Sequence, residues 1–481
     1  AFLLDNQIEM IEIGMGARHA GLYYTAIGNH LTAEEVLYIT QDSGAKVLFI
    51  NSATIKNIES IIPTLKEEHK VTIQYIGAID ELANEQATDI VSYQKTLEEQ
   101  SHYQAIQAAP LMGRDLLYSS GTTGRPKGIR KSLVIRTDPH QQDSEVAPWQ
   151  KNFGFNENSV YLTTAPMYHA APFRYIMRTL DVGGTCIIMK KFEPELSLSL
   201  IEQHQVTHSQ WVPTMFVRLL RLPEETKKTY DLSSMRMAIH AAAPCPIEVK
   251  RAMLEWWGDI IYEYYAGSEG IGTTLITPQE WWQHQGSVGR ITVGKIHILD
   301  DNDEELPVKE IGRVYFSGTG SFNYLNDPEK TKEAFNSKGW ATYGDIGYLD
   351  EEGFLYLCDR RSDLILAGGV NVYPQEIENV LINHPSVEDV AVIGVPNEDF
   401  GEVPKAIISL RNPELAGEEL AKELILFCRE KLSRIKIPKT IVFREEMPRM
   451  DSGKLSRKLL KNEYRNNPEQ GFDSREIFQN T

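Results

Sequence analysis

The stretch with the clearest capacity for chemistry is residues 118–131, which reads Tyr-Ser-Ser-Gly-Thr-Thr-Gly-Arg-Pro-Lys-Gly-Ile-Arg-Lys. Glycines let a backbone adopt positive φ angles and approach a ligand closely, and successive N–H groups in such a turn form a concave site for anions. The hydroxyl groups add donors, and the lysine adds a positive charge suited to phosphate. This pattern predicts a polyphosphate-binding loop made of Ser119, Ser120, Gly121, Thr122, Thr123, Gly124 and Lys127.

The loop is not a Walker A sequence, which places Gly directly before the lysine and Ser or Thr directly after it. Here Pro126 precedes Lys127 and Gly128 follows it, so we do not expect a helix to open at the lysine. A solvated loop rich in Gly, Ser and Thr is the alternative without function. Ten specified positions in a row argue against that alternative.

The order Ser-Ser-Gly-Thr-Thr-Gly-x-Pro-Lys-Gly resembles the phosphate loop of the adenylate-forming (AMP-binding) superfamily. That superfamily holds acyl- and aryl-CoA synthetases, the adenylation domains of peptide synthetases, and beetle luciferases. The resemblance implies a catalytic and metal-binding role for Thr123 and predicts further family motifs along the chain.

A second candidate segment, Tyr264–Gly270, follows the apolar run 260–262. Its aromatic ring could stack on a purine, and its carboxylate is a hard oxygen ligand for Mg²⁺; in isolation, an ordinary turn with a core tyrosine explains it better. It resembles the family's Tyr-Gly-x-Thr-Glu motif. The resemblance implies a nucleotide and acid site formed by Tyr265 on adenine, Gly267 at the acid, Ser268 on the α-phosphate and Glu269 as a catalytic Mg²⁺ ligand, with Ala242, Ala243 and Pro244 as an adenine-lining turn.

The segment 340–347 resembles the family's Tyr/Trp-x-x-Thr-Gly-Asp motif, with Tyr343 at the usual Thr position. The resemblance implies that Asp345 accepts hydrogen bonds from both ribose hydroxyls and that Arg360 contacts ribose or phosphate. A β-turn aspartate is the plain alternative for Asp345. Ser362 occupies the family's hinge position, where Asp or Lys is usual, which puts the detailed behaviour of the hinge in doubt.

Near the C-terminal end, residues 448–455 resemble the family's Pro-x-x-x-x-Gly-Lys motif. The resemblance implies that Lys454 is catalytic and bridges the substrate carboxylate and the α-phosphate. A lone lysine in a tail is otherwise a solvated charge. Only its occurrence together with the preceding motifs favours a functional role for Lys454.

Three weaker candidates complete the site. His169 follows a Pro-Met-Tyr turn and resembles the family's wall between acid and nucleotide, although a lone histidine is more often a packed one. The Gly368-Gly369 pair resembles the loop that lines the pantetheine tunnel of coenzyme A. Arg434 and Lys436, with Lys439, form a basic patch for the phosphates of coenzyme A or, equally, a solvated face.

Positioning these residues requires strands that alternate with helices. Short β-rich runs at 45–50, 71–76, 160–164, 182–189 and 235–240, with helices between them, predict parallel α/β organisation. Thr32 with Glu35 predicts a helix-opening capping box. Short alternating runs predict a β-rich subdomain over 286–357, and residues 137–158, rich in Gln, Asp and Pro, predict a loop.

The resulting fold class is α/β: a large N-terminal domain of parallel α/β subdomains plus a β-rich subdomain, then a small mobile α+β domain. We place the boundary so that the N-terminal AMP-binding domain covers 1–361 and the C-terminal domain covers 362–481. A chain of 481 residues usually divides, because single cores stop growing near about 250–300 residues. The opening Ala-Phe-Leu-Leu resembles a strand already under way, so we suspect that earlier residues are absent.

The net charge of −18 argues against a nucleic-acid surface, and any anionic ligand must meet a local concentration of basic residues. The four cysteines form no Cys-x-x-Cys pair, which is typical of free thiols in a reducing compartment, and we expect a cytoplasmic protein. No run of about 18 apolar residues is present, so no membrane span is expected.

At least five motifs in family order predict an AMP-forming acyl-CoA synthetase that uses a carboxylic acid, ATP, Mg²⁺ and coenzyme A. An enzyme that loads a carrier protein and a nucleotide-binding module without turnover are the alternatives. Small residues at 170–171 and 241–243 leave room for a bulky or long acyl group, which favours a fatty or alicyclic acid. The oligomeric state, a homodimer included, is left open.

Overall fold

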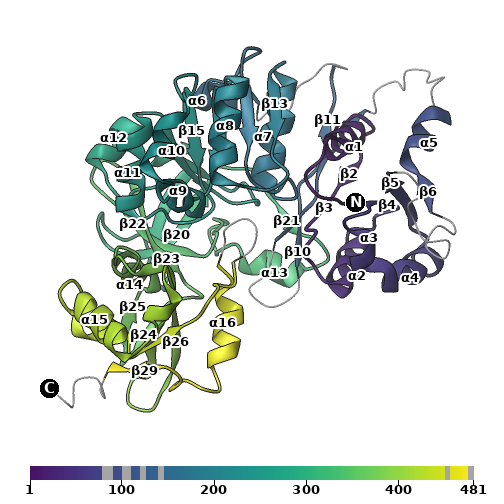
Figure 1. Ribbon diagram of the computed structural model, residues 1–481. Coiled ribbons are helices and arrows are strands. Elements are labelled where there is room, and N and C mark those ends of the chain that lie inside the picture. Colours follow the sequence, from purple (N-terminus) through teal and green to yellow (C-terminus); the bar gives the residue numbers. More distant parts are fainter. Residues whose placement is uncertain (78–89, 100–109, 120–125, 139–145, 450–454, 475–481) are drawn as a thin grey trace.

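The computed structural model describes residues 1–77, 90–99, 110–119, 126–138, 146–449 and 455–474. Two sheet-containing bodies lie side by side in the upper part of Figure 1, and the C-terminal segment forms a third body below them. The predicted α/β class is confirmed by this arrangement and by the mixture of parallel and antiparallel sheets.

The first body is built on a parallel sheet of strand order β3-β1-β4-β5-β6. Its strands are β1 (Phe2–Leu3), β3 (Ala26–Ile27), β4 (Val47–Asn51), β5 (Thr72–Ile76) and β6 (Val91–Ser92). Helix α1 (Ile8–His19) follows β1, and α2 (Ala33–Asp42) opens at Thr32. The predicted capping box is confirmed, because the backbone N–H of Glu35 donates to the Thr32 hydroxyl and the Thr32 N–H donates back to the Glu35 carboxylate at 2.9 Å.

The second body holds a seven-stranded sheet of order β13-β12-β14-β15-β16-β17-β18. The pairs from β13 to β16 are parallel, and β17 and β18 continue the sheet antiparallel. The strands are β12 (Val160–Thr163), β13 (Thr185–Ile188), β14 (His208–Trp211), β15 (Met237–His240), β16 (Ile261–Ala266), β17 (Thr273–Ile276) and β18 (Arg290–Val293). Its helices include α7 (Ala170–Asp181), α8 (Pro194–His204), α9 (Pro213–Leu220), α10 (Glu224–Thr229), α11 (Ile247–Trp257) and α12 (Pro278–Gln283).

The loop predicted over 137–158 is partly wrong, because α6 (Val146–Phe153) forms within it. Its buried residues Val146, Trp149 and Phe153 recur at helical spacing, and the rings of Trp149 and Phe153 pack against Tyr175 of α7. The Trp149 ring stacks on Phe155 at 4.0 Å. Tertiary packing of this stripe outweighs the loop-like composition around it.

Antiparallel strands lie beside and below these sheets, as predicted for 286–357. Strands β19 (Lys295–Leu299), β20 (Gly312–Ser317), β22 (Asp345–Leu349) and β23 (Leu355–Arg360) form one sheet. Strands β9 (Leu117–Ser119), β10 (Lys127–Arg130) and β21 (Asn323–Tyr324) form another. Helix α13 (Pro328–Glu333) follows β21.

The C-terminal body has its own hydrophobic cores, one around Ile377, Val392 and Leu424 and one around Ile393, Ile407 and Leu460. Its helices are α14 (Pro374–Leu381), α15 (Glu418–Arg429) and α16 (Arg457–Tyr464). Its strands are β24 (Ile365–Ala367), β25 (Val370–Val372), β26 (Val387–Asn397), β27 (Gly401–Leu410), β28 (Thr440–Phe443) and β29 (Phe472–Asp473). Arg221, just after α9, contacts this body by donating to the backbone oxygen of Glu388 at 2.6 Å.

All four cysteines are free, and Cys428 is buried. Among the described residues, no helix is long and apolar enough to cross a membrane.

Candidate active site

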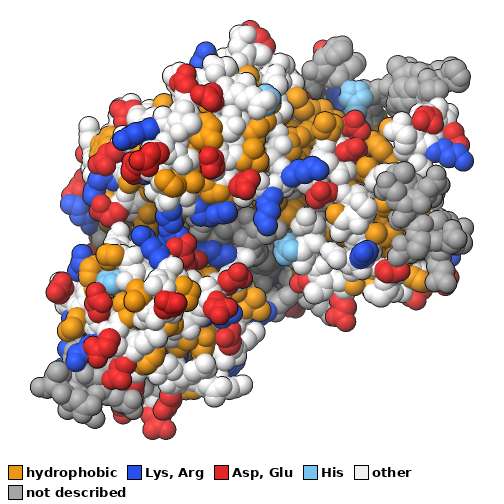
Figure 2. Space-filling view, in the orientation of Figure 1, with side chains coloured by type: hydrophobic (Ala, Val, Ile, Leu, Met, Phe, Trp, Pro, Cys, Tyr) orange, Lys and Arg blue, Asp and Glu red, His pale blue; other side chains and the backbone are white. Residues whose placement is uncertain are grey.

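One cleft of about 3160 Å³ runs between the sheets of the two upper bodies and the C-terminal body. Figure 2 shows this hollow, with Lys and Arg side chains gathered along it despite the net charge of −18. Most described residues of the predicted site line it: Ser119, Lys127, His169, Ala242, Ala243, Pro244, Tyr265, Gly267, Ser268, Glu269, Asp345, Arg360, Ser362 and Lys436.

Strands β9 and β10 carry the two ends of the predicted phosphate loop. Ser119 lies directly opposite Lys127 in this antiparallel pair, and both residues line the cleft. Residues Ser120, Gly121, Thr122, Thr123 and Gly124 themselves lie outside the described part of the chain. Lys127 begins a strand and no helix, as predicted, and its ammonium lies 5.4 Å from the centre of the Tyr324 ring. Partial burial and, after it, the nearby charge of Lys330 lower the pKa of Lys127.

The carboxylate of Glu269 lies in the same cleft and accepts a hydrogen bond of 2.9 Å from the Tyr324 hydroxyl. No cluster of three or more metal-ligating side chains occurs among the described residues. One carboxylate nevertheless fits Mg²⁺ bound to a nucleotide, because this ion keeps several waters and takes one or two carboxylates besides phosphate oxygens. The sequence does not indicate Tyr324 as a site residue, because its contact with Glu269 spans 55 positions.

Tyr343, the departure from the family's Thr, packs against the turn that carries Ser268 and Glu269. Its hydroxyl accepts from the Ile271 N–H at 3.0 Å and donates to the Gly272 oxygen at 3.0 Å. A Cβ at Gly267 would lie 2.2 Å from the Tyr343 ring, so the bulky ring requires glycine there. Burial raises the pKa of Tyr343 to about 12, and the phenol therefore keeps the proton that it donates.

Asp345 and Arg360 are brought together by strand register. They face each other at the ends of β22 and β23, and the guanidinium Nε lies 3.5 Å from an Asp345 carboxylate oxygen. The hydroxyl of Tyr265 donates to the other carboxylate oxygen of Asp345. The predicted adenine-stacking and ribose-binding side chains are therefore hydrogen-bonded neighbours.

The turn after β15 contains a backbone conformation that is unfavourable for alanine. Ala242 has φ of +75°, in the left-handed region where a Cβ is strained, and its side chain is exposed at the cleft. Residues held in such conformations cluster at functional sites.

We expect Ala242→Gly to raise the free energy of unfolding by about 0.5–1 kcal/mol, because removal of the Cβ relieves the strain at positive φ. Urea unfolding without nucleotide measures it. Ala243→Gly is the matched control: Ala243 is not among the described positive-φ residues, so glycine there should lower stability through the entropy of the unfolded chain. Equal losses in the two variants would contradict the strain at residue 242.

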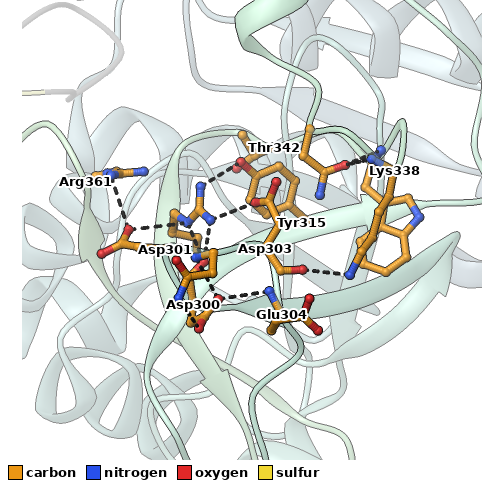
Figure 3. Close-up of polar contacts among 12 residues, drawn as sticks. Asp300, Asp301, Asp303, Glu304, Tyr315, Lys338, Thr342 and Arg361 are labelled. Atoms are coloured by element: carbon orange, nitrogen blue, oxygen red, sulfur yellow. Dashed lines mark hydrogen bonds and ion pairs between the residues drawn. The ribbon is translucent and has the colours of Figure 1, made fainter.

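The predicted hinge, Ser362, contacts α16 of the C-terminal body, and the adjacent Arg361 contacts the acidic turn 300–304. Lys461 of α16 donates to the backbone oxygen of Ser362 at 2.8 Å. Arg361 reaches the other way, with its guanidinium 3.3 Å from a carboxylate oxygen of Asp301 (Figure 3). Asp301 belongs to the acidic turn 300–304, in which Arg313 binds the backbone oxygen of Asp300 and the carboxylate of Asp303 at 2.8 Å. Both side chains of the Arg361–Asp301 ion pair are mostly exposed, so the pair contributes little to stability.

Not every predicted residue reaches the cleft. Lys454 lies outside the described residues, but Arg449 and Leu455, which flank it and form a bridge with each other, line the cleft. Gly368 and Gly369 form an exposed turn between β24 and β25 with φ of +57° and +82°, away from the cleft. Of the predicted basic patch, Arg434 is exposed elsewhere, whereas Lys436 lines the cleft and pairs with Glu376 at 2.7 Å.

Comparisons with known proteins identify the family of the chain. Residues 1–324 match the AMP-binding enzyme family, and residues 376–454 match the AMP-binding enzyme C-terminal domain. The chain is 30% identical over 466 residues to the long-chain-fatty-acid–CoA ligase FadD13 of Mycobacterium tuberculosis, covering 96% of this chain and 88% of the relative.

Two further relatives differ in the acid that their names print. A 3-[(3aS,4S,7aS)-7a-methyl-1,5-dioxo-octahydro-1H-inden-4-yl]propanoyl:CoA ligase of Mycobacterium tuberculosis is 32% identical, with 93% of this chain and 85% of the relative covered. The solved o-succinylbenzoate CoA synthetase from Bacillus subtilis, in complex with its acyl-adenylate intermediate, superposes with a TM-score of 0.75 at 27% identity, covering 98% and 88% of the two chains.

Proposed function

The chain belongs to the AMP-binding enzyme family, and from this premise we propose how its cleft performs the reaction of an AMP-forming acid–thiol ligase. The enzyme activates a carboxylic acid with ATP and transfers the acyl group to coenzyme A. The observation that carries the proposal is that the ends of the phosphate loop, Glu269, Asp345 and the residues flanking Lys454 all line one cleft.

In the first half-reaction a carboxylate oxygen of the acid attacks the α-phosphorus of ATP, and the bond to pyrophosphate breaks. Loop 119–127 holds the phosphates, and Ser268 donates to the α-phosphate. Asp345 accepts from the ribose hydroxyls while Tyr265 stacks on adenine, with the turn 242–244 beside it. Lys454 compensates the negative charge that grows on the α-phosphate and carboxylate in the transition state.

Mg²⁺ would be held by Glu269 and Thr123 and would neutralise charge on the phosphates. His169 separates the acid from the nucleotide, and Gly267 lies beside the acid. Both positions line the cleft, which supports these roles.

In the second half-reaction the thiol of coenzyme A attacks the acyl carbon, AMP leaves, and the thiol proton passes to the departing phosphate or solvent. The Gly368-Gly369 turn lies off the cleft. We therefore propose that the C-terminal body, residues 362–481, turns about Ser362 to bring this turn to the adenylate, with Arg434 and Lys436 binding the phosphates of coenzyme A. Such gating keeps water from the adenylate.

The acid is fatty or alicyclic. The small side chains of Ala170 and Ala171, which line the cleft next to His169, support a bulky or long acyl group. The printed names of the relatives include a long-chain fatty acid and a bicyclic propanoate, in agreement with this range. Four free thiols support action in the cytoplasm, and a homodimer is the assembly that we would test first.

The experiment that tests the function is a screen for acid-dependent pyrophosphate release over acids of graded length and ring content, followed by detection of the thioester with free coenzyme A. Pyrophosphate release and thioester formation that both depend on one acid would support the proposal. Thioester formation only on an acyl carrier protein would favour the carrier-loading alternative. Nucleotide binding without pyrophosphate release with any acid would overturn the enzymatic assignment.

A further inference from the structure

A polar contact away from the hinge joins the second body to the C-terminal body. Arg221 follows α9, which lies on the side of the second body toward the C-terminal body (Figure 1). Its guanidinium donates to the backbone oxygen of Glu388 at 2.6 Å and also to the Glu388 carboxylate. Glu388 belongs to β26, and both residues line the cleft. A planar guanidinium donates along fixed directions, so two such bonds set orientation as well as distance.

Another contact between the bodies lies close to the hinge. The carboxylate of Asp359, in β23, accepts from the backbone N–H of Gln375 at the start of α14 at 3.0 Å. Asp359 lies only three residues before Ser362, so a contact at this point alone still allows the C-terminal body to turn. The contact made by Arg221 lies outside the hinge segment. The two separated contacts together fix an orientation that one contact beside the pivot would not fix.

From Glu388 the contacts continue to the segment that carries Lys454. The next residue, Asp389, binds the Arg449 guanidinium through both carboxylate oxygens, at 2.5 and 2.6 Å. Arg449 and Leu455 lie on either side of that segment, form a bridge with each other and line the cleft. The second body is therefore connected, through β26, to the flanks of the segment that carries Lys454.

The contact between Arg221 and Glu388 is an ion pair at neutral pH. Burial lowers the pKa of Arg221 to about 10; the charge of Arg411 acts in the same direction, and the charge of Asp389 opposes it. The guanidinium therefore keeps its proton near neutrality. The side chains of Arg221 and Glu388 are 23% and 38% exposed, so this pair is better shielded from water than a fully exposed one.

We propose that Arg221 is a positioning residue for adenylate formation: by binding Glu388, it keeps the C-terminal body in the orientation in which the flanks of Lys454 line the cleft. This inference rests on the proposed function and adds a residue that favours one of its two half-reactions. The second half-reaction needs another orientation, because the Gly368-Gly369 turn lies off the cleft in this one. Separation of Arg221 from Glu388 is therefore part of the change from the first half-reaction to the second.

The test measures the two half-reactions separately in Arg221→Met, which keeps an apolar stem and removes the donors. Acid-dependent exchange of pyrophosphate into ATP should fall about five- to tenfold, because loss of a hydrogen bond to a charged group lowers the population of the competent orientation. Thioester formation from preformed acyl-adenylate and coenzyme A should be at least as fast as in the unmodified enzyme. A merely structural role would slow both.

Two further variants rank the contacts. Arg221→Lys, which keeps the charge, should retain part of the exchange rate. Glu388→Ala should lower that rate less than Arg221→Met does, because the backbone oxygen of residue 388 still accepts. Arg444→Met is the matched control, since Arg444 pairs with Glu463 at 2.9 Å within the C-terminal body and does not line the cleft. Both half-reactions should be unchanged in this control.

Two results would overturn the inference: Arg221→Met lowering both half-reactions equally, or Arg221→Met keeping pyrophosphate exchange within twofold of the unmodified enzyme, in each case with thermal unfolding unchanged. If Arg221→Met fails to fold, the two half-reactions of Glu388→Ala decide by the same criteria. Absence of pyrophosphate exchange with any acid in the unmodified enzyme would instead be a failure of the proposed function, so the two failures are distinguishable.

Discussion

Replacing Lys454 by Ala is expected to lower the rate of acyl-adenylate formation by about 10²–10³-fold or more while ATP still binds. The reason is that negative charge gathers on the α-phosphate and the attacking carboxylate only in the transition state, where a positioned ammonium has its largest effect. Acid-dependent exchange of pyrophosphate into ATP measures the first half-reaction, and equilibrium dialysis measures ATP binding.

The same variant separates the two half-reactions. Supplied with preformed acyl-adenylate and coenzyme A, Lys454→Ala should form thioester at a rate near that of the unmodified enzyme, because the lysine is assigned to the first step only. Lys56→Ala is the control, since Lys56 is an exposed lysine of the first body and does not line the cleft. Adenylate formation by Lys454→Ala within twofold of the unmodified enzyme would remove Lys454 from the mechanism.

Much of this arrangement could be predicted because the chemistry lies at the ends of strands. In open α/β sheets ligands bind at the carboxyl ends of the strands, and the turn 242–244 comes after β15 while Ser268 and Glu269 come after β16. Local signals also sufficed at Thr32, whose capping box involves residues only three positions apart. The capping box at Thr32 is therefore confirmed, whereas the loop predicted over 137–158 from local composition is partly wrong.

The parts that could not be predicted depend on contacts between distant segments. Trp149 reads as one aromatic residue in a polar stretch until α7 and Phe155 surround it. Tyr343 reads as a departure from a motif until its hydroxyl is seen bonded to a turn more than 70 positions away. No pattern of residue spacing in the sequence predicts either contact.

Lys250 is the strongest example of a residue whose contacts could not be predicted from the sequence. In the sequence it looks like a solvated lysine of α11, yet it is 0% exposed, and its ammonium lies 2.5 Å from the carboxylate of Glu263 on β16. The Nε2 atom of His240 lies 3.4 Å from the same carboxylate, and burial holds the pKa of His240 well below its usual value, so the imidazole is neutral. His240 immediately precedes the turn 241–244, and Tyr265 follows Glu263 by two residues. The Lys250–Glu263 ion pair, with His240 beside it, thus connects α11 to β15 and β16, the two strands that carry the predicted adenine site.

Lys250→Met is expected to lower the free energy of unfolding by about 3–5 kcal/mol, because it leaves the Glu263 carboxylate buried without its cation. Urea unfolding at neutral pH measures the loss. Burial already raises the pKa of Glu263, and without the lysine it should rise further. A carboxyl whose folded pKa is raised stabilises the protein at low pH and loses that contribution as pH rises, so the deficit of Lys250→Met should shrink as pH falls toward the raised pKa.

A second substitution tests whether the charge or the shape of Lys250 matters. Lys250→Met combined with Glu263→Leu should recover most of the lost stability, because an apolar pair of similar volume needs no compensation. Lys309→Met is the matched control, since Lys309 pairs with Glu351 on the surface and both side chains are 61% exposed, so its unfolding midpoint should not move. If the double variant is no more stable than Lys250→Met, packing of the lysine stem, and not its charge, supports the strand ends beneath the nucleotide turn.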